Sequence, residues 1–274
     1  MKETKIMKTF EQYIKKFDMN KGNVKAMYLH SIKMMELCKN IASNVGGFTE
    51  EEIIICGLIG LNHNLGMFSN KIKSCLVSDE NPDKSKETID ILFDKDGLMR
   101  QITDDKKYDE IIKFAIYCQN KPGLPAGFDE KTISFCKVLK DAITIENFRL
   151  VTNYSYMDMY IDNYPNDNFY NDFKKFKVIT AKKEDNDADK ILAIMSNIFG
   201  VYYSYSYSLL KTESSVDKLI DALKINNNGI NNFFTQIASV LKIYIDRKMY
   251  VCKWCETKHF RKMTQIIELF LFGC

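Results

Sequence analysis

Polar side chains lie at three places where the helical pattern of the chain predicts apolar residues: His30, the pair His63 and Asn64, and Asp141. His30 falls on the apolar stripe of segment 24–44, and Asp141 on that of segment 130–150. His63 and Asn64 follow the most apolar run of the sequence. Two imidazoles and a carboxylate that converge from separate helices could bind one divalent metal ion.

Each of these residues also has a structural interpretation. A single histidine on an apolar face is more often a hydrogen-bonded core residue than a ligand, and Asp141 could be an interior ion-pair partner. Their occurrence on three separate helices favours a shared site.

The composition predicts an all-α fold. The 274 residues are 46% hydrophobic, which is enough for a core, while 12 Gly and 4 Pro are too few for the turns of a β-sandwich or barrel. The net charge is +3 and only four residues are Arg, so the sequence does not favour nucleic acid as a partner, although it leaves this open.

Periodicity and capping residues predict where the helices lie. Thr49 and Glu52 form a capping-box pattern before the apolar helix that ends near Asn62. The tyrosine-rich stretch 202–208 keeps a helical period, whereas residues 151–185 read as irregular, either a lid or a surface connection. Helices are expected over 10–17, 24–44, 50–62, 87–93, 105–119, 130–150, 187–210, 215–225 and 230–250.

The sequence shows no sign of a membrane location. Its first 17 residues lack the apolar core of a signal peptide, and no apolar run approaches the roughly 18 to 20 residues that span a bilayer. These features predict a soluble, cytoplasmic protein.

Several stretches together resemble the HD-domain metal-dependent phosphohydrolase superfamily. They are LHSIKMMELCKNIA (29–42), EEIIICGLIGLNHNLGMF (51–68), LFDKDGLMR (92–100) and the segment 107–149, in the order and spacing of that family. The resemblance implies an HD-like helical bundle over residues 1–249 with an appended C-terminal helix in an extension, 250–274.

The resemblance also implies roles for the polar residues. In such proteins a first His, a His-Asp doublet and a later Asp hold a divalent metal whose bound water attacks a phosphoester. His30, His63 and Asp141 match the first His, the doublet His and the last Asp. Asn64 replaces the doublet Asp, and a neutral amide is a poorer metal ligand than a carboxylate.

Three further positions bear on the same chemistry. Similar proteins place His residues where this chain has Lys84 and Gln119, for a second metal or the substrate phosphate, and the basic residue before the last Asp is kept as Lys140. Lys84 could contact a phosphate as a point charge. The expected cofactor is therefore none, or one weakly bound divalent metal (Mn, Fe, Ni, Zn or Mg).

Three functional hypotheses remain. The favoured one is a degenerate HD-domain protein, a pseudoenzyme that binds a nucleotide-like or phosphate-bearing ligand or a protein partner. The second is an active mononuclear phosphohydrolase that acts on a nucleotide or another phosphoester. The third is a pure protein-interaction module.

The C-terminal extension carries a separate candidate site. Cys252, Cys255 and His259 have the spacing of zinc ligands, with Cys274 as a conceivable fourth, but a structural zinc site usually has two ligand pairs. Packed or exposed thiols are therefore the favoured interpretation. The short apolar end, IIELFLFGC, is typical of a docking helix or of a homodimer contact.

Overall fold

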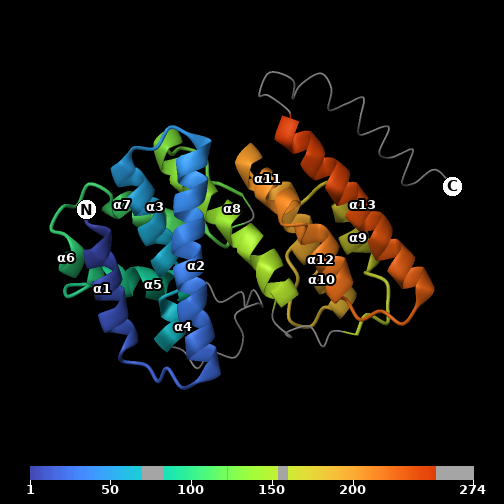
Figure 1. The fold of residues 1–274 in the computed structure, drawn as a ribbon, viewed down its shortest axis with the longest axis horizontal. Helices are drawn as coiled ribbons and strands as arrows, with labels where there is room; N and C mark the ends of the chain where they lie inside the picture. The colour runs from blue at the N-terminus through green and yellow to red at the C-terminus, as the bar shows by residue number, and fades with distance from the viewer. Residues whose placement is uncertain (70–82, 122, 154–159, 251–274) are drawn as a thin grey trace. The chain divides into compact units, whose positions relative to one another are not determined.

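The computed structural model describes residues 1–69, 83–121, 123–153 and 160–250. This part of the chain is built from helices, with one isolated bridge between Tyr160 and Lys224, and the predicted all-α class is confirmed (Figure 1). The helices are α1 (Glu3–Ile14), α2 (Gly22–Val45), α3 (Glu50–Asn62), α4 (Gly66–Ser69), α5 (Asp83–Phe93), α6 (Leu98–Ile102), α7 (Asp109–Cys118), α8 (Glu130–Asn153), α9 (Asp167–Lys174), α10 (Asp187–Ser196), the 3-10 helix η1 (Asn197–Gly200), α11 (Ser204–Thr212), α12 (Ser215–Ala222) and α13 (Asn228–Tyr250).

The chain divides into two compact units, Met1–Glu146 and Asn147–Cys274. The division falls within α8, so all of the candidate metal ligands predicted in the helical bundle belong to the first unit. The predicted boundary after residue 249 borders the segment 251–274, which lies outside the described residues, and it stays a prediction.

Helices α2 and α3 form an antiparallel hairpin. Gly46 and Gly47 have φ of 75° and 77°, which glycine adopts without steric cost, and they end α2. The predicted capping box is confirmed: the Glu52 backbone N–H donates to Thr49 Oγ1, and the Thr49 N–H donates to Glu52 Oε2 at 2.7 Å. These contacts fix the point at which α3 begins.

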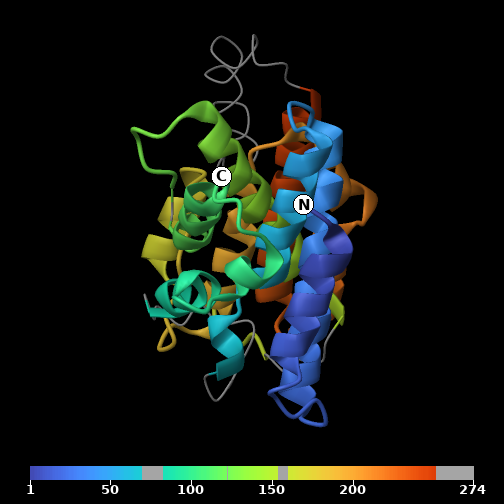
Figure 2. The ribbon, with the colours of Figure 1, turned by 90° about the vertical axis from the view of Figure 1, so that its left-hand side faces the viewer.

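Gly60 lets the two helices of the hairpin approach closely. A Cβ at this position would lie 2.5 Å from the Met34 carbonyl oxygen and 2.8 Å from Cys38 Sγ, so no larger residue fits without moving the backbone of α2. Both views show α2 and α3 side by side (Figures 1 and 2).

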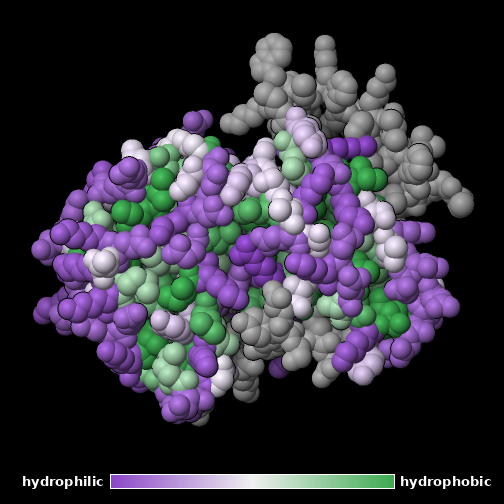
Figure 3. Space-filling view, in the orientation of Figure 1, coloured by the Kyte–Doolittle hydropathy of each residue, from purple (hydrophilic) through white to green (hydrophobic). Residues whose placement is uncertain are grey.

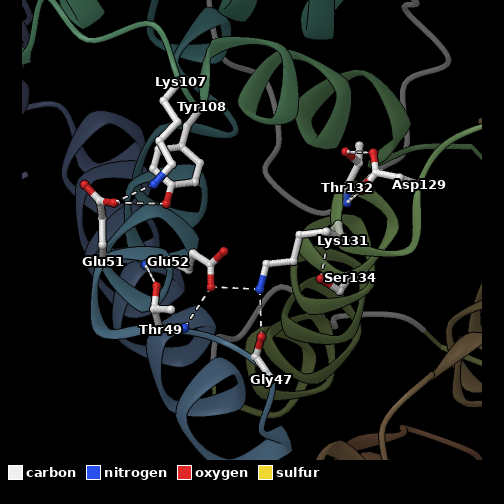
Figure 4. A network of polar contacts seen from close by, with 10 residues as sticks. All are labelled: Gly47, Thr49, Glu51, Glu52, Lys107, Tyr108, Asp129, Lys131, Thr132 and Ser134. Atoms are coloured by element: carbon white, nitrogen blue, oxygen red, sulfur yellow. Dashed lines mark hydrogen bonds and ion pairs between the residues drawn. The ribbon is translucent and has the colours of Figure 1, made fainter.

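Ion pairs tie the start of α3 to its neighbours (Figure 4). Lys131 Nζ of α8 lies 2.7 Å from Glu52 Oε2 and donates to the Gly47 carbonyl, also at 2.7 Å. Glu51 Oε2 accepts hydrogen bonds from Lys107 Nζ at 3.1 Å and from the Tyr108 hydroxyl at 3.0 Å. The N-terminal end of α3 is therefore linked to the segments that begin α7 and α8.

The second unit differs from the sequence prediction at two places. The stretch 151–185 was expected to be irregular, but it contains α9, which buries Phe169 and Phe173 one turn apart. The expected helix 187–210 is broken between Gly200 and Ser204. The Tyr207 hydroxyl lies within hydrogen-bonding distance of the carbonyl oxygens of Ile198 and Val201 there, at 3.1 and 2.9 Å, and so gives the Val201 carbonyl in the break a partner.

Hydrophilic residues cover most of the face of the first unit that Figure 3 shows, with smaller hydrophobic areas between them. Among the described helices, none is both long and apolar enough to cross a membrane.

Replacing Gly60 by Ala is expected to lower the free energy of unfolding by about 1–3 kcal/mol, because the new methyl group meets the backbone of α2. Urea unfolding followed by circular dichroism measures the change. Gly22→Ala, at the first residue of α2, is the matched control, since a Cβ there would meet no atom within 4 Å and alanine favours the helix. Equal losses in the two variants would contradict the role given to Gly60.

Candidate functional site

The hairpin brings His30 and His63 together. Gly60 of α3 lies against Met34 of α2, and the two histidines follow about one turn further toward the open end of the hairpin. Their ring centroids are 5.3 Å apart, with an angle of 58° between the ring planes. The sequence prediction that these imidazoles converge therefore holds in the structure.

His63 is a neutral, buried imidazole. The residue is 1% exposed, and its Nδ1 lies 2.7 Å from the Gly60 carbonyl oxygen. A carbonyl can only accept, so Nδ1 carries the hydrogen and the lone pair lies on Nε2. Burial, and next the charge of His30, lower the pKa of His63 to about 3, against the opposing effect of the hydrogen bond to Gly60.

The carboxylate found beside His30 is that of Glu146. His30 Nδ1 has no hydrogen-bond partner in the structure and lies 4.0 Å from Glu146 Oε1, and Glu146 is fully buried on α8. Sequence reasoning missed this residue. The available signal was a second carboxylate, one turn after Ala142, on the inward side of the helix that also carries Asp141.

Asp141 is fully buried as well, and its charge acts on a different turn of α2 from the one that carries His30. Burial, followed by the negative charge of Asp141, raises the pKa of the Cys38 thiol. Cys38 lies about two helical turns beyond His30. Of the two buried carboxylates of α8, Glu146 therefore lies beside His30, and Asp141 acts on Cys38, about two turns further along α2.

The Gln119 side chain is hydrogen-bonded inside the protein. Its amide Nε2 donates to the His63 carbonyl oxygen at 3.0 Å and to Ser85 Oγ at 3.4 Å. These bonds hold the end of α3 against α5 and the end of α7.

The Lys140 side chain caps the C-terminal end of α7. Its Nζ donates to the carbonyl oxygens of Lys121 at 2.5 Å, Gln119 at 3.4 Å and Cys118 at 3.5 Å. A cation at this end of a helix interacts favourably with the helix dipole. Burial lowers the pKa of Lys140.

The remaining predicted residues lie nearer the surface. Asn64 is half-buried in the turn between α3 and α4, and Lys84 is half-buried near the start of α5. Cys252, Cys255, His259 and Cys274 lie outside the described residues, so the zinc hypothesis stays a prediction.

Structural and catalytic metal sites usually take three or more protein donors. In the described part of the chain, no group of three or more His, Cys, Asp or Glu side chains is found that could hold an ion. We derive no metal-dependent step.

Comparisons of the chain with protein-family models, with curated proteins and with solved structures give no match. The HD-like assignment therefore depends on the sequence features described above.

The buried state of His63 predicts loss of stability in acid. In the unfolded chain a histidine has a pKa near 6.5, so between pH 6.5 and about 3 the unfolded state binds a proton that the native state does not. The free energy of unfolding should fall as the pH decreases through this range, by up to about 1.4 kcal/mol per pH unit from this group.

Urea unfolding at pH 7, 6, 5 and 4 tests this dependence. The His63→Gln variant removes the titrating group and should show a shallower decline than the unmodified protein. The same slope in both proteins would contradict the assigned state of His63.

Proposed function

We propose that this chain is a non-catalytic HD-like protein that acts by binding a nucleotide-like, phosphate-bearing ligand or a protein partner. The observation that carries the proposal is the role of Gln119. At a position where similar proteins have a histidine, its amide is hydrogen-bonded to the His63 carbonyl and to Ser85, inside the protein.

The burial of the central side chains supports the same conclusion. His30 is 9% exposed, His63 is 1% exposed, and Asp141 has no exposed surface. A hydrolase must let both substrate and water reach its reacting groups, whereas the two imidazoles pack against each other within the helical core.

The charge of the site supports it further. Asn64 supplies a neutral amide where the family has a carboxylate, and a divalent metal loses binding energy and water activation when one negative ligand is removed. Lys84 and Gln119 also lack the imidazole nitrogen that could replace it.

One observation favours an active mononuclear phosphohydrolase as the second candidate. The hydrogen bond from His63 Nδ1 to the Gly60 carbonyl leaves the lone pair on Nε2, and metal-binding histidines are commonly oriented in this way by a backbone carbonyl. Metal content and hydrolysis distinguish the two candidates.

Protein purified without chelator is expected to contain far less than one equivalent of Mn, Fe, Ni or Zn by elemental mass spectrometry. It should also release no phosphate from nucleoside mono-, di- and triphosphates when these metals are added. A stoichiometric metal that is lost in the His63→Ala variant, together with hydrolysis, would establish the active candidate and contradict the proposal.

The Asn64→Asp variant restores the doublet carboxylate and should raise the affinity for Mn²⁺ about tenfold or more, because it adds a negative ligand beside His63. Titration calorimetry measures the change. Asn120→Asp, an equal charge change on an exposed residue of the turn after α7, is the control and should leave the affinity unchanged. No difference between the two variants would mean that Asn64 does not face the histidines.

A further inference from the structure

The outer face of α7 carries exposed aromatic rings beside lysines. Tyr117 is 51% exposed, and Phe128, from the loop that follows, is 48% exposed. Exposed aromatic side chains that lie close together are typical of binding surfaces. Helix α7 belongs to the group of helices α5 to α7 on the viewer's side in Figure 2.

Two rings of this surface are in contact, and a third is a neighbour on the helix. Phe128 stacks on Phe114, with ring centroids 3.7 Å apart and an angle of 30° between the planes. Phe114 and Tyr117 are three residues apart on α7, so their side chains are neighbours on the helix surface. The stack holds Phe128 in place before any ligand arrives, which reduces the entropy lost on binding.

Two lysines alternate with these rings. Lys121 Nζ lies 4.8 Å from the centroid of the Tyr117 ring, and Lys113 Nζ lies 5.0 Å from that of Phe93 on α5. Lys113 is also paired with Glu110 at 2.8 Å. Among the described residues no carboxylate pairs with Lys121, so its charge is available to an anion.

We propose that this α7 surface, formed by Phe93, Lys113, Phe114, Tyr117, Lys121 and Phe128, binds a free nucleotide. The base stacks on an exposed ring, and the phosphates lie at the lysines, with Lys121 as the principal contact. Stacking on aromatic rings tolerates any base, so the surface should show little base preference. The inference rests on the proposed binding function, and it gives that function a location outside the histidine core.

Titration calorimetry of the full chain with ATP and GTP tests the proposal. Both should bind with similar affinity, adenosine and tripolyphosphate should each bind more weakly than ATP, and added salt should weaken the nucleotides because it screens the phosphate–lysine attraction. Tripolyphosphate that binds as well as ATP would overturn the stacking role of the rings.

Two variants locate the site. Tyr117→Ala should weaken ATP binding about tenfold, as expected for loss of one stacking platform, and Lys121→Gln about fivefold to tenfold. The matched controls are Tyr164→Ala, which removes an equally exposed tyrosine of the second unit, and Lys15→Gln, on the exposed end of α1. Circular dichroism verifies that the variants are folded.

Two outcomes would overturn the proposal. One is that the unmodified protein binds no nucleotide at millimolar concentration, or that both surface variants bind ATP with the affinity of the unmodified protein. The other is that a 12-nucleotide single-stranded oligonucleotide binds far more tightly than ATP and loses affinity in the same variants, which would assign the surface to nucleic acid. Neither outcome affects the metal and hydrolysis measurements that test the loss of catalysis.

Discussion

The first unit depends on the close approach of α2 and α3 at Gly60. With the Met34 carbonyl oxygen only 2.5 Å from where a Cβ would stand, the two helix axes are nearer than ordinary side chains permit. The hairpin turn and the capping box fix the register of this contact. Because the register is fixed, His30 and His63 face each other one turn away, and every later feature of the polar core follows from their position.

Burying polar groups in a core of this kind is costly unless they are hydrogen-bonded, and His30 Nδ1 is one atom left without such a bond. An unsatisfied buried donor or acceptor costs about 1–3 kcal/mol, and a buried charge costs more. His63 meets this requirement by remaining neutral and bonding Gly60, and Gln119 and Lys140 meet it by donating to backbone carbonyls. The same contacts that stabilise the fold occupy His63 Nδ1 and the amide nitrogen of Gln119.

Local sequence signals were sufficient for much of this architecture. Helical periodicity located α2 and α3, and the Thr49 capping box and the pairing of the two histidines follow from spacing within one hairpin. Glu146 was missed because its place beside His30 depends on a contact more than one hundred residues apart in the chain. The break before Ser204 was missed for a similar reason: the Tyr207 hydroxyl stabilises it, and periodicity does not register such a bond.

Helix α7 connects the buried polar core of the first unit to its surface. Its inner face buries Ile112, Ala115 and Ile116 and leads directly to Gln119, whose hydrogen bonds fix the end of the helix. A helix anchored in this way holds its outer side chains rigidly, including Tyr117. The hydrogen bonds of Gln119 therefore help to orient the exposed aromatic side chains on the opposite face of the helix.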